Sequence, residues 1–303
     1  MNAPALVLDR LTLRFGRTVA LRDVSLAVEP GTVLGLVGRN GAGKTTALRL
    51  AMGILWPDEG RVRTLDLDPV TDGTAVRERA SLLSEETALY PWMTVGEVLT
   101  LSAALHPKWD AALAAHTRKS LDLDPAARIA DLSRGTKAKV ALVAAVAPRP
   151  ELLLLDDPTA GLDPVVRREV LEALLATVVA QGGAVVYASH LIHDVERIAD
   201  RVVVLDAGRV RCDAALDALR AGIVRARAVF NGGDLPGVAI PGTLTTERDG
   251  RVFTVIAEAD GADVRAALLG AGATHVEITP LTLEEILIAM LRERRASTEV
   301  SRV

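Results

Sequence analysis

Residues 33–52 read VLGLVGRNGAGKTTALRLAM, in which an apolar run leads into a glycine-rich turn and then into a helical pattern. The turn satisfies GxxxxGK[ST] with Gly38, Gly43, Lys44 and Thr45. Glycines let backbone N–H groups curl around phosphate oxygens, the lysine supplies a cation, and the threonine hydroxyl is a ligand for Mg²⁺. A helix that starts at the loop adds its positive dipole end. The stretch predicts a strand–loop–helix unit that binds a nucleoside triphosphate through Gly38, Arg39, Asn40, Gly41, Ala42, Gly43, Lys44, Thr45 and Thr46.

Short apolar runs follow along the chain and alternate with helical patterns such as Pro164–Gln181. Runs of this kind are typical of strands buried on both faces, and their alternation with helices favours a mostly parallel sheet with helices on both faces. Two segments near the start alternate apolar and polar residues, which predicts antiparallel strands. The expected parallel strands are Val33–Val37, Glu151–Leu155, Gly183–Ala188 and Val202–Leu205, and the antiparallel ones are Ala5–Phe15 and Val19–Val28.

Two regions differ from this core. Trp92–Val146 is rich in Ala and Leu at helical spacing and predicts an inserted helical subdomain. After about Arg220 the pattern changes to short strands, with a hairpin turn at Asp249-Gly250 and a capping box at Thr282 and Glu285. We therefore expect an α/β P-loop nucleoside triphosphatase core with an antiparallel β subdomain at residues 1–220, a helical subdomain at about 92–146, a small α+β domain at 221–292 and a flexible tail at 293–303.

Composition narrows the function classes. The chain has 303 residues, a formal net charge of −4 and no basic stretch, which argues against a nucleic-acid partner. Its single cysteine, Cys212, excludes an internal disulfide and fits a reducing compartment. No signal-peptide pattern is visible in MNAPALVLDR, and no apolar run reaches the roughly 18 residues of a membrane helix. We expect a cytoplasmic protein without a membrane span of its own.

Further motifs fall in a specific order around the glycine-rich turn. They are Phe15 before it, LSRGTK at Leu132–Lys137, LLLLDDPTAGLD at Leu152–Asp163, and His190 after GAVVYAS. With these motifs the chain resembles the ATP-binding subunits of ABC transporters over about Ala5–Gly222. The resemblance implies a cytoplasmic ATPase, peripheral on the inner face of the cell membrane. It would use ATP and Mg²⁺ and would act with separate transmembrane permease subunits and a second nucleotide-binding subunit, by expectation a second copy.

The resemblance also implies a role for each matching residue. Phe15 would stack on adenine, although its position also suits a core phenylalanine at a strand end. Ser133 and Gly135 would contact the γ-phosphate of ATP bound to the partner subunit, whereas alone Ser133 reads as a helix N-cap. Asp156 would hold Mg²⁺, and His190 would hydrogen-bond the γ-phosphate. Asp163 would lie in the loop that links the two active sites.

Three places depart from the family pattern. Arg134 and Thr136 replace a glycine and the glutamine of the signature, and Glu85 aligns with a glutamine that contacts Mg²⁺ and the attacking water. Asp157 stands where the family carries a glutamate that polarises this water. The aspartate is shorter by about 1.5 Å, and a misplacement of about 1 Å can cost roughly 100-fold in rate. Either the backbone compensates and the protein is a normal motor, or hydrolysis is slow and the ATP-bound dimer is long-lived.

One segment and the overall function keep alternatives open. Tyr90, Trp92 and Met93 match the loop on which the membrane subunit docks in the family, or they are core packing of the helical subdomain. The first functional hypothesis is the ATPase of an exporter, because the small C-terminal domain with its TLEEIL helix resembles exporter subunits. The second is a nucleotide-gated binding or regulatory protein with slow turnover. The third, a soluble ABC ATPase of translation or DNA repair, ranks last because the chain has neither a second nucleotide motif nor a long coiled coil.

Overall fold

The computed structural model describes residues 3–84, 89–159, 162–231 and 240–290. It divides into two compact units, Met1–Asp213 and Ala214–Val303. The boundary predicted from the sequence, after residue 220, falls within helix α8 (Leu216–Gly222), which packs against the first strand of the second unit. The first unit contains two sheets and the second unit one, and each unit has its own hydrophobic core.

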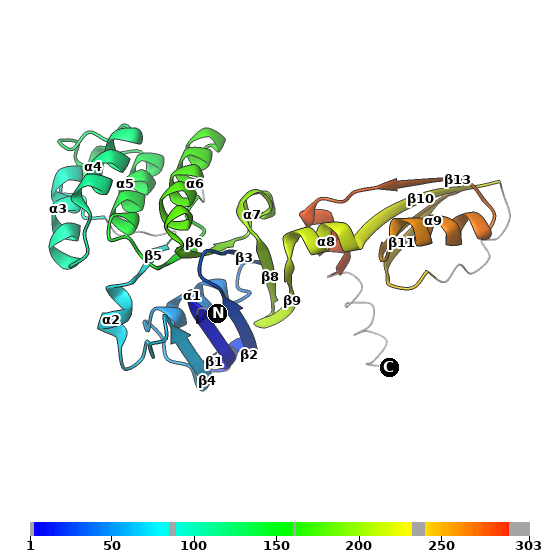
Figure 1. The fold of residues 1–303 in the computed structure, drawn as a ribbon, viewed down its shortest axis with the longest axis horizontal. Helices are drawn as coiled ribbons and strands as arrows, with labels where there is room; N and C mark the ends of the chain where they lie inside the picture. Colours follow the sequence, from blue (N-terminus) through cyan, green and yellow to red (C-terminus); the bar gives the residue numbers. More distant parts are fainter. Residues whose placement is uncertain (1–2, 85–88, 160–161, 232–239, 291–303) are drawn as a thin grey trace. The chain divides into compact units, whose positions relative to one another are not determined.

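A six-stranded sheet forms the centre of the first unit (Figure 1). Neighbouring strands pair in parallel from the first to the fifth, as predicted, because the four-leucine run and its neighbours are apolar on both faces. All five residues of the second strand are buried. In spatial order the strands are β5 (Ala80–Ser84), β6 (Leu152–Asp156), β7 (Ala184–Ser189), β3 (Val33–Gly38), β8 (Arg201–Asp206) and β9 (Arg209–Ala215).

Helices cover both faces of this sheet, as expected. Leu34 and Leu36 of β3 belong to a core shared with α1 (Lys44–Ala51). Gly35, which points to the opposite face, lies against α7 (Ile192–Ile198), where an added Cβ would be 2.2 Å from Val195 Cγ1. The remaining helices around the sheet are α2 (Gly73–Arg77), α6 (Pro164–Val178) and the 3₁₀ turn η2 (Val179–Gln181).

A three-stranded antiparallel sheet joins the same core. Its order is β2 (Thr18–Val28), β1 (Leu6–Phe15) and β4 (Glu59–Thr64), and the predicted pairing of the first two strands is confirmed. Leucines of β1 and β2 share a hydrophobic cluster with α1 and with β6. The antiparallel sheet therefore packs against the phosphate-loop region rather than forming a separate domain.

The helical subdomain lies apart from the antiparallel sheet, and its helices pack side by side (Figure 1). Each helix begins at a capping residue that the sequence supplies: Thr94, Asp110 and Ser133 accept hydrogen bonds from backbone N–H groups in the first turn. At Thr94 the reciprocal bond from Glu97 completes a capping box. The elements are α3 (Val95–Leu105), α4 (Ala111–Ser120), η1 (Ile129–Asp131) and α5 (Arg134–Val146).

The second unit is a four-stranded antiparallel sheet with α9 packed on one face. Ala226, Ala228, Val255 and Val276 point into its core, where Leu268 of the helix meets them. The predicted hairpin at Asp249-Gly250 and the capping box of Thr282 with Glu285, which opens helical residues 283–290, are confirmed. In sheet order the strands are β11 (Thr243–Asp249), β12 (Val252–Glu258), β10 (Ile223–Phe230) and β13 (Ala273–Thr279), and the helix is α9 (Gly261–Gly270).

The side chain of Arg201 connects the last residues of the first unit to two other strands. Its Nε and Nη2 donate to the two carboxylate oxygens of Asp213, each at 2.6 Å, and its Nη1 donates to the carbonyl oxygen of Ala27 at 3.0 Å. One guanidinium therefore joins β8, β9 and the antiparallel sheet.

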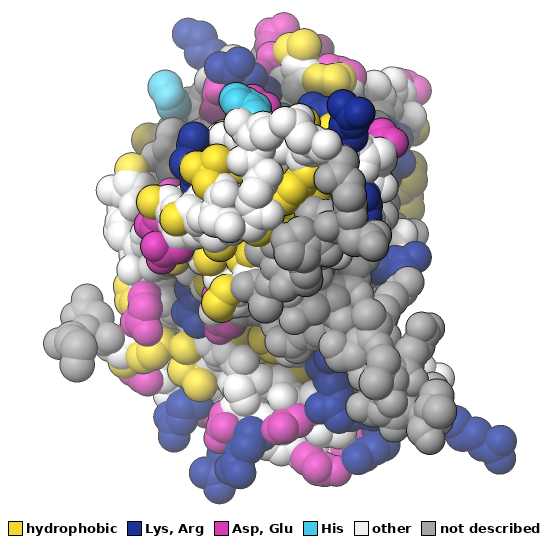
Figure 2. All heavy atoms as spheres, turned by 90° about the vertical axis from the view of Figure 1, so that its right-hand side faces the viewer, with side chains coloured by type: hydrophobic (Ala, Val, Ile, Leu, Met, Phe, Trp, Pro, Cys, Tyr) yellow, Lys and Arg dark blue, Asp and Glu magenta, His cyan; other side chains and the backbone are white. Residues whose placement is uncertain are grey.

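The surface carries mixed charge. On the face drawn in Figure 2, Lys and Arg side chains stand among Asp and Glu side chains, and neither sign gathers into a continuous patch. Within the described part of the chain, no helix combines the length and the apolar character that crossing a bilayer requires.

Candidate functional site

The phosphate loop lies between β3 and α1, as the sequence predicts, and its shape depends on glycine. Gly43 has φ 106° and caps α1. A Cβ at this residue would lie 2.6 Å from Leu21 Cδ2 and 2.8 Å from the Ala20 carbonyl oxygen, so a larger residue would clash with β2. The Lys44 ammonium donates to the Gly38 carbonyl oxygen at 2.8 Å. The loop therefore curls around the cation that is expected to meet the phosphates.

Thr45 and Asp156 meet at the carboxyl edge of the parallel sheet. The Thr45 hydroxyl donates to Asp156 Oδ1 at 3.0 Å. Burial raises the pKa of Asp156, and burial also lowers the pKa of Lys44, against the pull of Asp157 and Asp156. The charged form of Asp156 is therefore stabilised by the Lys44 ammonium, and the charged form of Lys44 by the carboxylates of Asp157 and Asp156.

These two oxygen-bearing side chains fit a magnesium ion. Mg²⁺ prefers hard oxygen ligands and usually takes one or two from the protein, with water and substrate phosphate as the others. In the ranges that the structure describes, no group of three or more His, Cys, Asp or Glu side chains forms a complete cage for a metal. A hydroxyl and one buried carboxylate beside the phosphate loop match the sparse protein ligand set of Mg²⁺.

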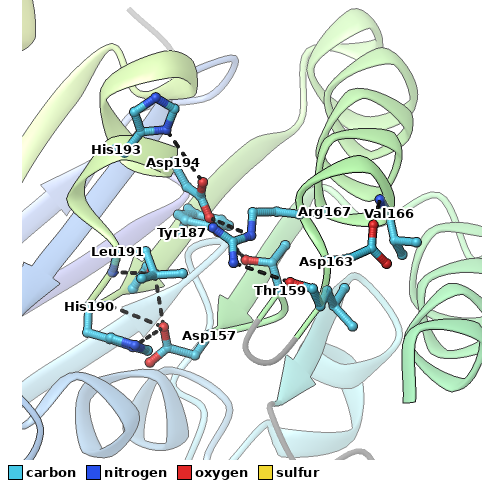
Figure 3. A network of polar contacts seen from close by, with 12 residues as sticks. Asp157, Thr159, Asp163, Val166, Arg167, Tyr187, His190, Leu191, His193 and Asp194 are labelled. Carbon is cyan, nitrogen blue, oxygen red and sulfur yellow. Dashed lines mark hydrogen bonds and ion pairs between the residues drawn. The ribbon is translucent and has the colours of Figure 1, made fainter. Parts of the chain in front are cut away.

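Asp157 and His190, predicted separately, come together at the ends of β6 and β7 (Figure 3). Asp157 has the left-handed φ of 45°, and its N–H donates to the Ala188 carbonyl oxygen at 2.8 Å. Its Oδ1 accepts from Ser189 Oγ at 2.9 Å, from the His190 backbone N–H at 3.2 Å and from His190 Nδ1 at 2.9 Å. The unusual backbone therefore aims the short carboxylate at the end of the neighbouring strand.

The pair constrains the chemistry of His190. A carboxylate only accepts hydrogen bonds, so Nδ1 carries a proton when it bonds Asp157, and Nε2 can then donate to a phosphate only from the doubly protonated ring. The imidazole is 43% exposed while the Asp157 side chain is 13% exposed. The histidine can therefore reach a ligand while it holds the carboxylate in place.

The other predicted site residues lie in two further places. Phe15 ends β1 with 51% of its surface exposed, so the core-phenylalanine interpretation is wrong. Ser133 caps α5 by accepting from the Thr136 N–H at 3.1 Å, and Asp163 caps α6 by accepting from two N–H groups. Gly135 faces the start of α6, where an added Cβ would be 3.4 Å from Val166. Glu85 lies outside the described residues.

Tyr90 and Trp92 are surface residues, which excludes core packing for both. They are 47% and 69% exposed, and their ring centroids are 5.1 Å apart. Tyr90 borders a mostly apolar groove of about 450 Å³ between α3, α5 and the end of α1. Met93 is half-buried, and its backbone N–H donates to the Tyr90 carbonyl oxygen at 3.1 Å.

Comparison with known proteins identifies the family. Residues 21–160 match the ABC transporter family. The daunorubicin resistance ATP-binding protein DrrA3 of Streptomyces coeruleorubidus is 35% identical over 226 residues, which make up 73% of this chain and 71% of that protein. The chain belongs to the ABC transporter family. As a member of this family it is an ATP-binding protein and an ATPase, as the motifs predicted.

Two further ABC proteins extend the comparison. The ABC transporter ATP-binding protein YtrB of Bacillus subtilis is 27% identical over 275 residues, and the match covers 91% of this chain and 94% of that protein. A solved ATP-binding subunit of an ABC transporter superposes with a TM-score of 0.66 and 27% identity over 71% of this chain and 92% of that one. The P-loop α/β fold expected from the sequence is confirmed.

Some partners of the ABC site residues were not predicted from the sequence. Ser189 was read only as part of the strand motif, yet it donates to Asp157. A further polar group, drawn near the Asp157–His190 pair in Figure 3, consists of the buried residues Thr159, Tyr187 and Asp194 and the partly buried Arg167. The sequence does show polar residues at or just after the ends of buried strands, such as Ser189 and Thr159. Such residues are too common for the sequence to indicate which of them contact each other.

Proposed function

We propose that this ABC ATPase powers a membrane exporter as one of two copies that ATP joins head to tail, with separate permease subunits. The observation that carries the proposal is the separation of the predicted site into two groups. Lys44, Thr45, Asp156, Asp157 and His190 surround the phosphate loop. Ser133 and Asp163 are exposed at the starts of α5 and α6, where a second copy can reach them.

Within one subunit, each group has a task that its geometry suits. The loop amides and Lys44 bind the phosphates, and Phe15 stacks on the adenine. Asp157 accepts the proton of the attacking water, while His190 hydrogen-bonds the γ-phosphate. The hydroxyl of Thr45 and the carboxylate of Asp156 would hold Mg²⁺, which neutralises phosphate charge when bound. Glu85 is proposed as a further contact to the ion and the water.

The second copy would complete the site. Ser133 Oγ accepts from the Thr136 N–H, so this hydroxyl sits at the positive end of α5, where a phosphate oxygen is favoured. Gly135 lies in the same first turn of α5, and its backbone N–H is proposed to contact the same phosphate. Asp163, at the start of α6, would lie between the two nucleotides, so that binding at one site affects the other.

The proposal of export is supported by the relatives that the chain matches, and the proposal of a permease partner by the apolar groove. The match with YtrB extends over the C-terminal unit as well as the ATPase core. DrrA3 is named for daunorubicin resistance, and pumping a drug out of the cell is a direct route to resistance. The apolar groove beside Tyr90, with Trp92 exposed nearby, suits a short amphipathic helix of a permease, which would place the subunit on the inner face of the membrane.

A nucleotide-gated clamp with slow turnover is the second candidate. Asp157 is shorter than the glutamate of the family pattern, and three donors already converge on its Oδ1. A carboxylate held this firmly by the neighbouring strand has less freedom to reach a water on the γ-phosphate. The ATP-bound dimer would then persist, and a permease would have to reposition the water.

The test compares steady-state Mg²⁺-ATPase rates of the native chain, Asp157→Glu and Lys44→Ala. A native rate equal to that of Asp157→Glu, with Lys44→Ala as the blank, supports the motor. Fast turnover by Asp157→Glu alone supports the clamp.

Sedimentation with ATP tests the head-to-tail dimer, which should be lost in Ser133→Arg. Co-purification with a polytopic membrane protein tests the permease. A native chain that stays monomeric with ATP contradicts the dimer.

A further inference from the structure

The carboxylate of Asp194 is buried near the Asp157–His190 pair and contacts side chains from three other segments of the chain (Figure 3). Asp194, on α7, is 3% exposed. Its Oδ2 lies 3.2 Å from Thr159 Oγ1, 3.4 Å from the Tyr187 hydroxyl and 3.6 Å from Arg167 Nε (Figure 3). Thr159 and Tyr187 are fully buried, and their hydroxyl oxygens are 3.0 Å apart. The group is therefore one connected polar network inside the protein.

The network is built around a charge that is costly to bury. An ionised carboxylate in the interior needs hydrogen bonds and an opposite charge. Burial, with help from the Asp194 and Asp157 carboxylates, raises the pKa of Tyr187, so its hydroxyl stays protonated and remains a donor. Arg167 supplies the positive charge, although its buried Nε has no hydrogen-bond partner within the described residues. The link through Arg167 is thus an ion pair too long to be a hydrogen bond.

Three members of the network flank the catalytic pair along the chain. Thr159 follows Asp157 by two residues, Tyr187 precedes His190 by three, and Asp194 follows His190 by four. The contacts at Asp194 therefore hold together the two chain segments that carry the catalytic carboxylate and the catalytic imidazole. A shift of Asp194 would move both segments.

Arg167 connects the same carboxylate to the turn that precedes α6. Its Nη2 donates to the Leu162 carbonyl oxygen at 3.3 Å, and its backbone N–H donates to the Asp163 carbonyl oxygen at 3.0 Å. Asp163 itself caps α6 and is exposed. A movement of the exposed turn therefore reaches Asp194 through one side chain.

We propose that Asp194 is a positioning residue for ATP hydrolysis, which keeps Asp157 and His190 in register and, through Arg167, couples them to the Asp163 turn. The inference deepens the proposed function, because the Asp163 turn is the surface that a second copy is proposed to contact. Dimer formation would press on this turn and align the catalytic pair. Without the network, nucleotide would still bind but the water would be poorly aligned.

The experiment measures kcat, KM for ATP and the unfolding temperature for Asp194→Asn, Tyr187→Phe and Arg167→Met. Asp194→Asn keeps the size and removes the charge, and Tyr187→Phe keeps the buried ring and removes one hydroxyl. Arg168→Met is the matched control, since this neighbouring arginine is exposed and its Nε forms an ion pair with Glu172 one turn further along the helix, at 2.6 Å. Asp194→Glu tests rescue by a carboxylate.

We expect Asp194→Asn and Arg167→Met to lower kcat by about 10-fold or more and to change KM by less than about twofold, because misplacement slows chemistry without weakening binding. The double variant Asp194→Asn/Arg167→Met should lose no more kcat than the more impaired of the two single variants, since the two side chains act as one unit. Tyr187→Phe should lower kcat less, Asp194→Glu should recover part of the loss, and Arg168→Met should match the native chain.

A native kcat in folded Asp194→Asn, or in Tyr187→Phe and Arg167→Met if Asp194→Asn does not fold, would overturn the proposal. A fall in unfolding temperature with native kcat would mean that the network only stabilises the fold. Sedimentation with ATP tests the proposed dimer independently of the role of Asp194. If the native chain stays monomeric with ATP, the dimer fails, while a selective loss of kcat still assigns the positioning role to Asp194.

Discussion

Replacing Phe15 by alanine tests whether adenine is held at the end of β1. The ring is 51% exposed, so its removal takes little apolar surface out of the core and should leave the unfolding temperature near that of the native chain. A base stacked on an aromatic ring gains about 1–3 kcal/mol. Since a tenfold change in affinity corresponds to about 1.36 kcal/mol, the dissociation constant for ATP should rise about 5- to 150-fold.

The assay is a nucleotide titration at equilibrium, run in parallel with inorganic tripolyphosphate. Phe15→Ala should weaken ATP binding and leave tripolyphosphate binding unchanged, because only ATP has a base. Phe15→Trp keeps a stacking surface and should retain native affinity. An ATP affinity within about twofold of native in Phe15→Ala, or an equal loss for both ligands, would refute the stacking role.

Three further predictions concern the phosphate loop and the edge of the sheet. Lys44→Ala should weaken ATP binding by at least about 10-fold, since it removes a charge-assisted contact of about 1.5–3 kcal/mol, and undiminished ATPase in this variant would contradict the phosphate-loop assignment. Gly43→Ala should lower the unfolding temperature more than Gly41→Ala, because both residues have positive φ but only the Cβ at Gly43 meets Leu21 and Ala20; equal losses in calorimetry would contradict this. Hydrogen bonds from Arg79 hold the pKa of Glu151 below its ordinary value of 4.5. A lowered carboxyl pKa stabilises the fold above the unfolded-state pKa, so the advantage of the native chain over Glu151→Gln should shrink as the pH falls below about 4.5. Melting curves across this range would contradict the reasoning if the difference stayed constant.

The parts of the fold that the sequence revealed are those with strong local signals. The four-leucine run, the glycine-rich turn and the Asp249-Gly250 hairpin each determine their own conformation, and all three are found as predicted. β4, with the sequence EGRVRT, was missed because it is an edge strand whose outward residues are charged. β5 was missed because its five residues become a strand only by pairing with β6.

The candidate site divides in the same way. Lys44, Thr45 and Asp156 follow from motifs, because their positions are set by one loop and one strand end. The bond from Ser189 to Asp157 and the bond from Thr159 to Asp194 join residues more than 30 positions apart, and no local pattern records which polar residues will meet. The left-handed backbone of Asp157 is likewise imposed by the neighbouring strand, through the bond to Ala188.

The arginine that closes the first unit has a consequence for how such a gene can change. Arg201 fastens the last strand of that unit to two others through Asp213 and Ala27, which both lie before residue 214. Insertions, exchanges or losses in the sequence after Asp213 therefore leave this closure intact. Recombination at this point gives the same ATPase core different C-terminal units without rebuilding the nucleotide site.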